Sequence, residues 1–282
     1  MPAVLIAGSL HYDIMVEADH LPRRDETAVG SRWYPKFGGK GGNQAVAVAK
    51  AGVPSRMLGA VGADDFGPFL RAGLTTAGVD DRFVATVSTG SGMSVAIMDG
   101  AGDYAATIVS GANLMVQVPQ DPALWDDIAL VVLQNEMPEP ANRAVAQAAR
   151  ARGIPVLLNA APARTLSPDF AALVDILVVN AVEAEMMGGP HVCCLSSAAE
   201  AAEALAKDFE TVVVTAGGQG LAAWTAQDHS FAFAAEKVKV VSTHGAGDAF
   251  IGALAAEVIR GAEFEAACRA ASKAAAKHVS GG

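Results

Sequence analysis

An α/β fold with a doubly wound, mostly parallel sheet flanked by helices is predicted by three features of the sequence. Short apolar runs rich in β-branched residues alternate with alanine-rich stretches through most of the 282 residues. Several runs, such as Ile128–Leu133, are apolar at consecutive positions, which is typical of strands covered on both faces by helices. Two pairs of strand-like segments lack an intervening helix and predict a small inserted sheet.

The strands of the large sheet are expected, in chain order, at Ala3–Ala7, Ser55–Val61, Ile128–Leu133, Pro155–Leu158, Asp175–Val179 and Thr211–Thr215. Helices are expected between or after them, and most close with a glycine at or just beyond the end. Their ranges are Gly42–Gly52, Phe66–Gly78, Pro138–Gly153, Ser197–Asp208, Ala246–Gly261 and Glu263–Val279. Because no repeat or long linker interrupts this order, residues 1–282 are expected to form one domain.

The small sheet is expected from Tyr12–Val16 with Ala28–Pro35, and from Met93–Met98 with Tyr104–Val109, the latter pair joined by a glycine-containing turn at 99–103. A sheet formed by about residues 11–37 and 91–110, near the carboxyl ends of the parallel strands, can act as a lid over a ligand crevice. Apolar positions on an isolated sheet favour pairing with a second copy, so a homodimer through the lid sheets is expected.

Composition excludes several classes of protein. The formal net charge of −10 opposes nonspecific nucleic-acid binding, and no apolar run approaches the ~20 residues that a membrane span needs. The N-terminus lacks basic residues and turns polar by Ser9, so we expect no secretory signal and a cytoplasmic location. The three cysteines show neither a disulfide framework nor a metal-ligand spacing.

The segment from Ser242 to Phe250 carries the strongest chemical signal. Small residues precede a helix start there, so the main-chain N–H groups of Ala246, Gly247 and Asp248 can converge on an anion. A carboxylate at this place would repel a phosphate unless an alcohol lies between them, which predicts Asp248 as the base that activates a hydroxyl for phosphoryl transfer. The alternative is a first-turn carboxylate next to turn glycines, without a catalytic role.

A second glycine-rich segment surrounds Lys40, with glycines at positions 38, 39, 41 and 42. Such a loop allows close main-chain approach to a ligand, and Asn43 adds amide donors and an acceptor for hydroxyls. The phosphate-binding Walker A pattern fails because Tyr34 and Gly41 stand where it needs Gly and Ser or Thr, and the dinucleotide pattern fails at Gln44. A merely flexible turn is the alternative.

Together the two segments resemble the signatures of the ribokinase, or PfkB, family of sugar and nucleoside kinases, in the family's order and separation. Gly245–Asp248 is similar to the C-terminal signature and Phe37–Ala45 to the N-terminal one. Further similar stretches are Gly111–Asn113, Asn159–Arg164 and Asn180–Glu183, so the resemblance runs from Gly8 to about Val279. It implies a ribokinase-like fold, ATP with Mg²⁺ as phosphoryl donor and a sugar as acceptor.

For the acceptor, the resemblance implies a pocket completed by Asp248, with further sugar contacts from Asp13, Gly39, Lys40, Asn43 and Glu136. It also implies an anion hole formed by the amides of Gly245, Ala246, Gly247 and Asp248. Asp13 has the alternative of a charge on a solvated strand face, and Glu136 that of a simple strand-end acid.

For the donor, the resemblance implies Asn180 near the nucleotide phosphates and Glu183 as a water-mediated Mg²⁺ ligand, although Asn-x-x-Glu is also a helix-capping pattern. The stretch Thr215–Gly220 is similar to the family's nucleotide loop and equally compatible with a glycine-rich hairpin. The implied nucleotide contacts are Thr215, Gly217, Gly218 and Gly220, with the adenine near Ser272 of the last helix.

Three positions depart from the family pattern. Ser242 stands where ribokinases generally carry an Asp that helps to bind a monovalent cation, and the chain ends at Gly282, before the segment that would supply further ligands; activation by K⁺ is therefore expected to be weak or absent. His11 replaces an Asn that touches the sugar, which puts ribose itself in doubt. His244 is unusual at its position and has a plain loop role as its alternative.

Three functions remain open at this level. The first is transfer of a phosphoryl group to a primary hydroxyl of ribose or a related pentose or ketose. The second is a nucleoside kinase acting on adenosine or pseudouridine, which needs a stacking surface from aromatic side chains such as Tyr12, Trp33, Tyr34 and Tyr104. The third is a sugar-binding regulator without catalysis.

Overall fold

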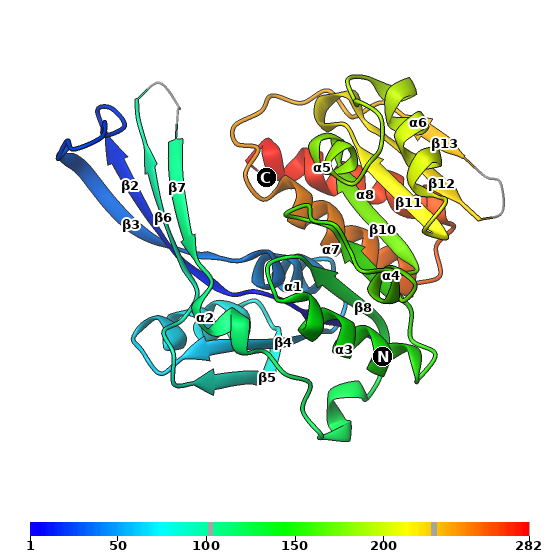
Figure 1. The fold of residues 1–282 in the computed structure, drawn as a ribbon, viewed down its shortest axis with the longest axis horizontal. Helices are drawn as coiled ribbons and strands as arrows, with labels where there is room; N and C mark the ends of the chain where they lie inside the picture. Colours follow the sequence, from blue (N-terminus) through cyan, green and yellow to red (C-terminus); the bar gives the residue numbers. More distant parts are fainter. Residues whose placement is uncertain (101–103, 227–229, 282) are drawn as a thin grey trace.

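The computed structural model describes residues 1–100, 104–226 and 230–281, and its largest element is a nine-stranded sheet (Figure 1). The strand order is β13-β12-β11-β10-β9-β8-β1-β4-β5, and every pairing from β11 to β5 is parallel. The strands are β1 Ala3–Ala7, β4 Ser55–Gly62, β5 Asp80–Val87, β8 Ile128–Gln134, β9 Val156–Asn159, β10 Ile176–Asn180, β11 Thr211–Thr215, β12 Leu221–Thr225 and β13 Phe231–Phe233. The predicted doubly wound, mostly parallel sheet is confirmed.

Helices cover both faces of this sheet, as the consecutive apolar residues in its strands require. The helices that pack on one face are α1 Lys40–Lys50, α2 Phe66–Thr76, α7 Ala246–Ile259 and α8 Phe264–Val279. The other face is covered by α3 Glu139–Arg150, α4 Pro168–Ala171, α5 Ala181–Met186 and α6 Leu195–Leu205, with the 3₁₀ turns Gly111–Met115 and Pro122–Trp125. Among the described residues, no helix combines the length and apolar character that crossing a bilayer would need.

A second, four-stranded sheet projects from the first (Figure 1). Its order is β3-β2-β6-β7, with β2 and β6 parallel and the other neighbours antiparallel. The strands are β2 His11–Ala18, β3 Gly30–Gly38, β6 Met93–Met98 and β7 Tyr104–Val109. The turn expected at 99–103 falls partly outside the described residues, because 101–103 are not among them.

The two halves of the large sheet diverge between β1 and β8. From β1 the chain builds outward through β4 and β5, whereas from β8 it builds in the opposite direction through β9, β10 and β11. The loops that leave the carboxyl ends of these two strands therefore separate, and the crevice between them is where ligands bind in open α/β sheets. Two residues predicted to bind the acceptor come from the segments after these strands. Asp13 lies in β2, which follows β1, and Glu136 comes shortly after the end of β8.

Candidate active site

Asp248 lies in the first turn of α7, as the sequence predicted, and is 8% exposed. The helix starts at Ala246 because Gly245 adopts a left-handed conformation with a φ of 81°, which favours glycine. In this turn the Ala246 N–H donates to the Thr243 carbonyl oxygen at 3.3 Å, whereas the N–H groups of Gly247 and Asp248 have no partner among the described residues and can face an anion. Burial raises the pKa of the Asp248 carboxyl, while the nearby Lys40 lowers it.

The two glycine-rich signatures meet at this carboxylate. Asn43 and Gln44, both on α1, donate side-chain N–H bonds to Asp248 Oδ2 at 3.2 Å and to Oδ1 at 2.9 Å, respectively. Gly39 precedes α1 with a φ of 86°, and a β-carbon there would lie 2.7 Å from the Ser9 carbonyl oxygen. The glycine-rich loop therefore brings the start of α1 against the end of β1, so it is not merely a flexible turn.

A second acid, Glu136, follows β8 and joins the same group of side chains. Its Oε2 accepts the main-chain N–H of Lys40 at 2.9 Å and also the hydroxyl of Ser9. Glu136 thus bridges the segments after β1 and β8 across the point where the sheet diverges. Glu136 also acts on the Asp248 carboxyl, whose pKa it raises further.

Asp13 and His11 lie at the base of the small sheet and complete the acceptor side. Asp13 Oδ1 accepts the Ser94 hydroxyl at 2.5 Å, and Oδ2 lies so close to Gly38 that a β-carbon there would be 1.9 Å away. Burial raises the pKa of Asp13, against the lowering effects of the Ser94 hydrogen bond and His11. His11 is 4% exposed, and its Nε2 has no hydrogen-bond partner among the described residues, which is unusual for a buried polar atom.

The loop before α7 carries two of the three departures from the family pattern, Ser242 and His244. His244 is exposed, its carbonyl oxygen contacts His278 Nε2 at 2.9 Å, and its imidazole is close enough to Asp13 to lower the pKa of that carboxyl. Ser242 is exposed, and its hydroxyl accepts the His244 N–H at 3.3 Å.

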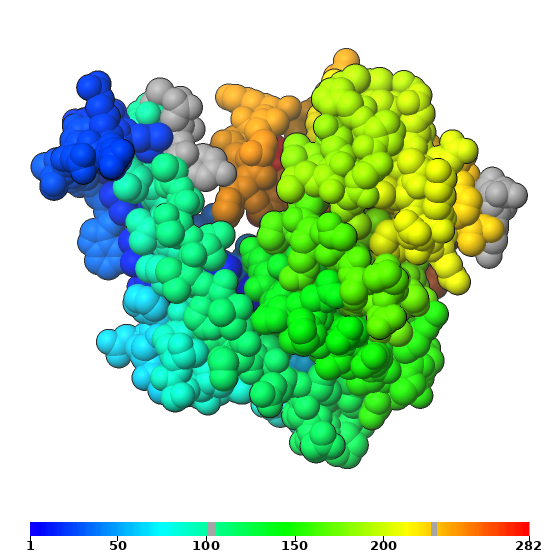
Figure 2. All heavy atoms as spheres, viewed as in Figure 1, coloured from blue at the N-terminus to red at the C-terminus, as the bar shows by residue number. Residues whose placement is uncertain are grey.

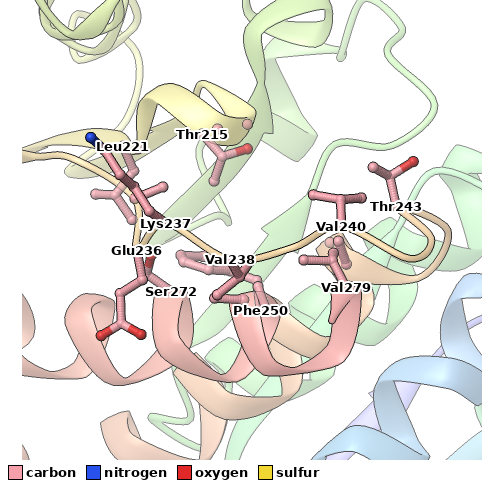
Figure 3. A pocket seen from close by; sticks show the side chains of 18 residues that line it. Thr215, Leu221, Glu236, Lys237, Val238, Val240, Thr243, Phe250, Ser272 and Val279 are labelled. Carbon is pink, nitrogen blue, oxygen red and sulfur yellow. The ribbon is translucent and has the colours of Figure 1, made fainter. Parts of the chain in front are cut away.

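An apolar cavity of about 420 Å³ opens beside the first turn of α7 (Figure 3). The predicted nucleotide residues Thr215, Gly217, Gly218, Gly220 and Ser272 all line it, together with Ala246 and Gly247. Val238 and Val240 come from the irregular segment before α7, and Phe250 from α7 itself; Figure 3 shows these side chains gathered over the two last helices. The size and apolar walls suit a purine, and the turn of α7 at one end suits its phosphates.

Thr215–Gly220 is a hairpin, as one of the two interpretations of that stretch predicted. Thr215 of β11 pairs with Leu221 of β12 in antiparallel register, and Gly217–Gln219 forms a 3₁₀ turn between them. The hairpin holds the glycines at the rim of the cavity, where they leave room for a ligand.

Asn180 and Glu183 form a complete capping box at the start of α5. Asn180 Oδ1 accepts the Glu183 N–H, and Glu183 Oε2 accepts the Asn180 N–H, both at 2.8 Å. Burial raises the pKa of the Glu183 carboxyl, while the hydrogen bond from the Asn180 N–H and the charge of Lys40 lower it. With Oε2 in the cap, Oε1 stays available, and one carboxylate suffices for a Mg²⁺ ion that keeps most of its waters. The residues present therefore fit such an ion, with Glu183 as its holder.

Several lining residues were not predicted. The segment with Ala235, Glu236, Lys237, Val238 and Val240 forms one wall of the cavity without regular secondary structure, so periodicity offers no signal for it. Ser9 and Gln44 were also missed, although the adjoining motifs place both beside predicted site residues. Their roles depend on contacts between distant segments.

Comparison with known proteins agrees with this geometry. The model of the pfkB family of carbohydrate kinases matches residues 1–281. A ribokinase of Haemophilus influenzae is 30% identical over 97% of this chain and 91% of its own, and a deoxyribokinase of Salmonella typhi is 32% identical over 99% and 92%. The solved ribokinase of Arabidopsis thaliana, complexed with ribose and ATP, is 28% identical and superimposes with a TM-score of 0.91 over 99% of this chain and 92% of its own.

Proposed function

Because the chain belongs to the pfkB family of carbohydrate kinases, we propose that it transfers the γ-phosphoryl group of ATP to a primary hydroxyl of ribose or a related pentose or ketose. One observation carries the proposal. Asp248 lies between the polar side chains at the base of the small sheet and the apolar cavity, in a helix turn where the N–H groups of Gly247 and Asp248 have no partner among the described residues. An alcohol and a nucleotide phosphate can thus meet beside one carboxylate.

In this mechanism, Asp13, Asn43 and Glu136 hold the sugar by its hydroxyl groups, and His11 Nε2 provides a buried partner for a further oxygen. Asp248 accepts the proton of the primary hydroxyl as that oxygen bonds to the γ-phosphorus and ADP leaves. The amides of Gly245–Asp248 stabilise the charge on the transferred group. A Mg²⁺ ion held by Glu183 would neutralise phosphate charge when bound.

The small sheet is proposed to act as the lid over the acceptor. Asp13 belongs to it, so closure of the sheet and binding of the sugar would be linked. Seen as spheres, the small sheet stands apart from the segment before α7 with a hollow between them (Figure 2). Closing this hollow would exclude water and limit hydrolysis of ATP.

A sugar is favoured over a nucleoside by the state of one aromatic ring. Tyr12 is stacked on Phe66 of α2, with ring centroids 4.1 Å apart, and meets Phe69 edge-on at 4.8 Å. One face of its ring is therefore occupied by α2, which weakens it as a stacking surface for a base. Trp33, in contrast, is 63% exposed on the edge strand β3, so the nucleoside alternative would need this ring, and not Tyr12, as its stacking surface.

The test is a panel of acceptors in an ADP-release assay with Mg-ATP: ribose, 2-deoxyribose, fructose, adenosine, inosine and pseudouridine. We expect the highest kcat/KM with a free sugar. A nucleoside preferred tenfold over every sugar would reverse the choice of acceptor. Sugar binding by calorimetry without ADP release under any metal condition would instead favour the non-catalytic regulator.

Potassium is proposed not to activate the enzyme, since Ser242 brings no charge to the loop beside the anion hole. The initial rate in KCl and in choline chloride at the same ionic strength should agree within about twofold, because uniform screening acts equally in both salts. A many-fold higher rate in KCl would contradict this.

Two copies of the chain are proposed to pair through their small sheets. The strands β3 and β7 are edges, and Trp33, Ile108 and Val109 on them are more than half exposed. Such edges favour burial against a partner. A sedimentation mass of one chain at micromolar concentration would overturn the pairing.

A further inference from the structure

A chain of buried amide side chains runs from Asp248 into the core. Gln44 donates from Nε2 to Asp248 Oδ1 at 2.9 Å, and its Oε1 accepts from Gln134 Nε2 at 2.7 Å. Gln134 is the last residue of β8, so the chain links α7, α1 and the central sheet. Both glutamine residues are 0% exposed, so bulk water does not compete for either contact.

The direction of this chain is set by the carboxylate. Ionised Asp248 has acceptors only, so Gln44 must present its NH₂ group to it and turn its carbonyl oxygen toward Gln134. Gln134 must in turn present its own NH₂ group. An ionised Asp248 therefore fixes the orientation of both amide groups, and the structure has this orientation.

This arrangement has a cost at its far end. Gln134 Oε1 is buried without a donor among the described residues, and it lies against Gly8, where a β-carbon would be 2.0 Å away. An unsatisfied buried carbonyl destabilises a fold. Stability alone therefore does not explain two buried glutamines in this order, whereas a role at Asp248 does.

The two oxygens of Asp248 are consequently unequal. Oδ1 is held by the fully buried Gln44, while Oδ2 is contacted at 3.2 Å by Asn43, which is partly exposed and can turn toward a bound sugar. We propose that Gln44, itself held by Gln134, is a positioning residue that fixes the Asp248 carboxylate and leaves Oδ2 as the oxygen that takes the proton from the acceptor. This inference rests on the proposed function.

The charges around Asp248 predict how the loss of Gln44 would act. Lys40 on α1 favours the ionised form, Glu136 after β8 opposes it, and His244 faces it from the loop before α7. Removing the Gln44 donor takes away a hydrogen bond that the ionised form receives and the protonated form does not need. The pKa of Asp248 then rises. Because the base acts when it is deprotonated, the acidic limb of the pH profile of kcat/KM moves to higher pH.

The test uses Gln44→Met and Gln134→Met, which keep the side-chain length and remove the amide. For Gln44→Met we expect kcat to fall about 10- to 100-fold, the usual range for a hydrogen bond to a charged group, with KM for the sugar changed less than threefold. The acidic limb should move up by about one pH unit. Gln134→Met should shift the limb in the same direction by less.

Asn142→Leu is the matched control. Asn142 is also 0% exposed, and its amide donates to the main-chain oxygen of Gln134 at 2.7 Å without touching Asp248. We expect this variant to lose stability while its acidic limb stays in place. An equal shift in all three variants would mean that Gln44 acts only by supporting the fold, and an unshifted limb in both glutamine variants would overturn the proposal.

Titration of Asp248 by carboxyl ¹³C NMR, without substrates, supplies a readout independent of turnover. If Gln44→Met does not fold, the titration of Gln134→Met decides: a midpoint above that of the parent protein supports the proposal, and an equal midpoint refutes it. Failure of the kinase function itself is recognised separately, because the parent protein would then release no ADP with any acceptor of the panel.

Discussion

Replacing Asp248 with asparagine is expected to lower kcat by about 100- to 10,000-fold, the range that a general base contributes, while the sugar still binds. Asn retains an oxygen that can accept the Gln44 bond at Oδ1, so the geometry of the site persists. It cannot take up the proton of an attacking alcohol. Initial-rate kinetics with Mg-ATP, and calorimetry of sugar binding, would measure the two effects separately.

The same variant should be more stable than the parent protein at neutral pH. Burial raises the pKa of Asp248 in the folded chain above its unfolded value, so above both values the ionised carboxylate weakens the fold. Asn removes this cost, and Tm should rise by a few degrees at pH 7. The gain should vanish in acid, where the carboxyl is protonated in both states.

Asp169→Asn provides the control for this pair of effects. Asp169 is likewise an acid in the first turn of a helix, but it is exposed on α4 and lines neither side of the site. Its replacement should leave kcat unchanged. Near-normal turnover in Asp248→Asn as well would reduce Asp248 to a first-turn carboxylate and remove the base from the mechanism.

Placing a second carboxylate in the anion hole should have a comparably large effect. Gly247 is the second residue of α7 and lines the cavity, and a β-carbon there would meet no atom within 4 Å. Gly247→Asp should therefore fold normally, and an acid in the first turn favours the helix. Its charge lies where the γ-phosphate is expected, so kcat/KM for ATP should fall at least about 100-fold.

Gly247→Asn separates charge from size. Asn has nearly the same shape and no charge, and we expect it to lose less than about a tenth as much activity as the Asp variant when both are compared with the parent protein. High salt should narrow the difference in part. Equal losses in the two variants would mean that bulk, and not repulsion of a phosphate, is responsible.

The central fold could be predicted because its strands are apolar at consecutive positions. Ile128–Leu133 and Thr211–Thr215 have few polar residues to confuse the pattern, and both are strands in the structure. Three strands were not predicted: β5 begins with charged residues, β12 is short and partly alanine, and β13 has three residues. Of these, β5 and β13 are the edges of the sheet and are largely half-exposed, so their sequences carry a weaker apolar signal.

The residues of the candidate site also fall into those that the sequence could predict and those that it could not. Local motifs were sufficient to find Asp248, Asn43 and the glycines around them, because a helix start and a tight loop need particular small residues. The wall formed by Val238 and Val240 could not be found, since an irregular segment has no period. Nor could the link from Gln134 to Gln44, which joins residues 90 positions apart in the chain.

Because the sheet diverges between β1 and β8, the residues proposed for the acceptor and those proposed for the nucleotide come from different parts of the sequence. The groups proposed to hold the alcohol come almost entirely from residues up to 136, and the described residues that line the cavity proposed for the nucleotide come from residue 215 onward. The start of α7 is proposed to serve both. Substitutions in the first stretch can therefore retune the choice of sugar without redesigning the nucleotide cavity, which would let relatives with one common donor diversify in what they phosphorylate.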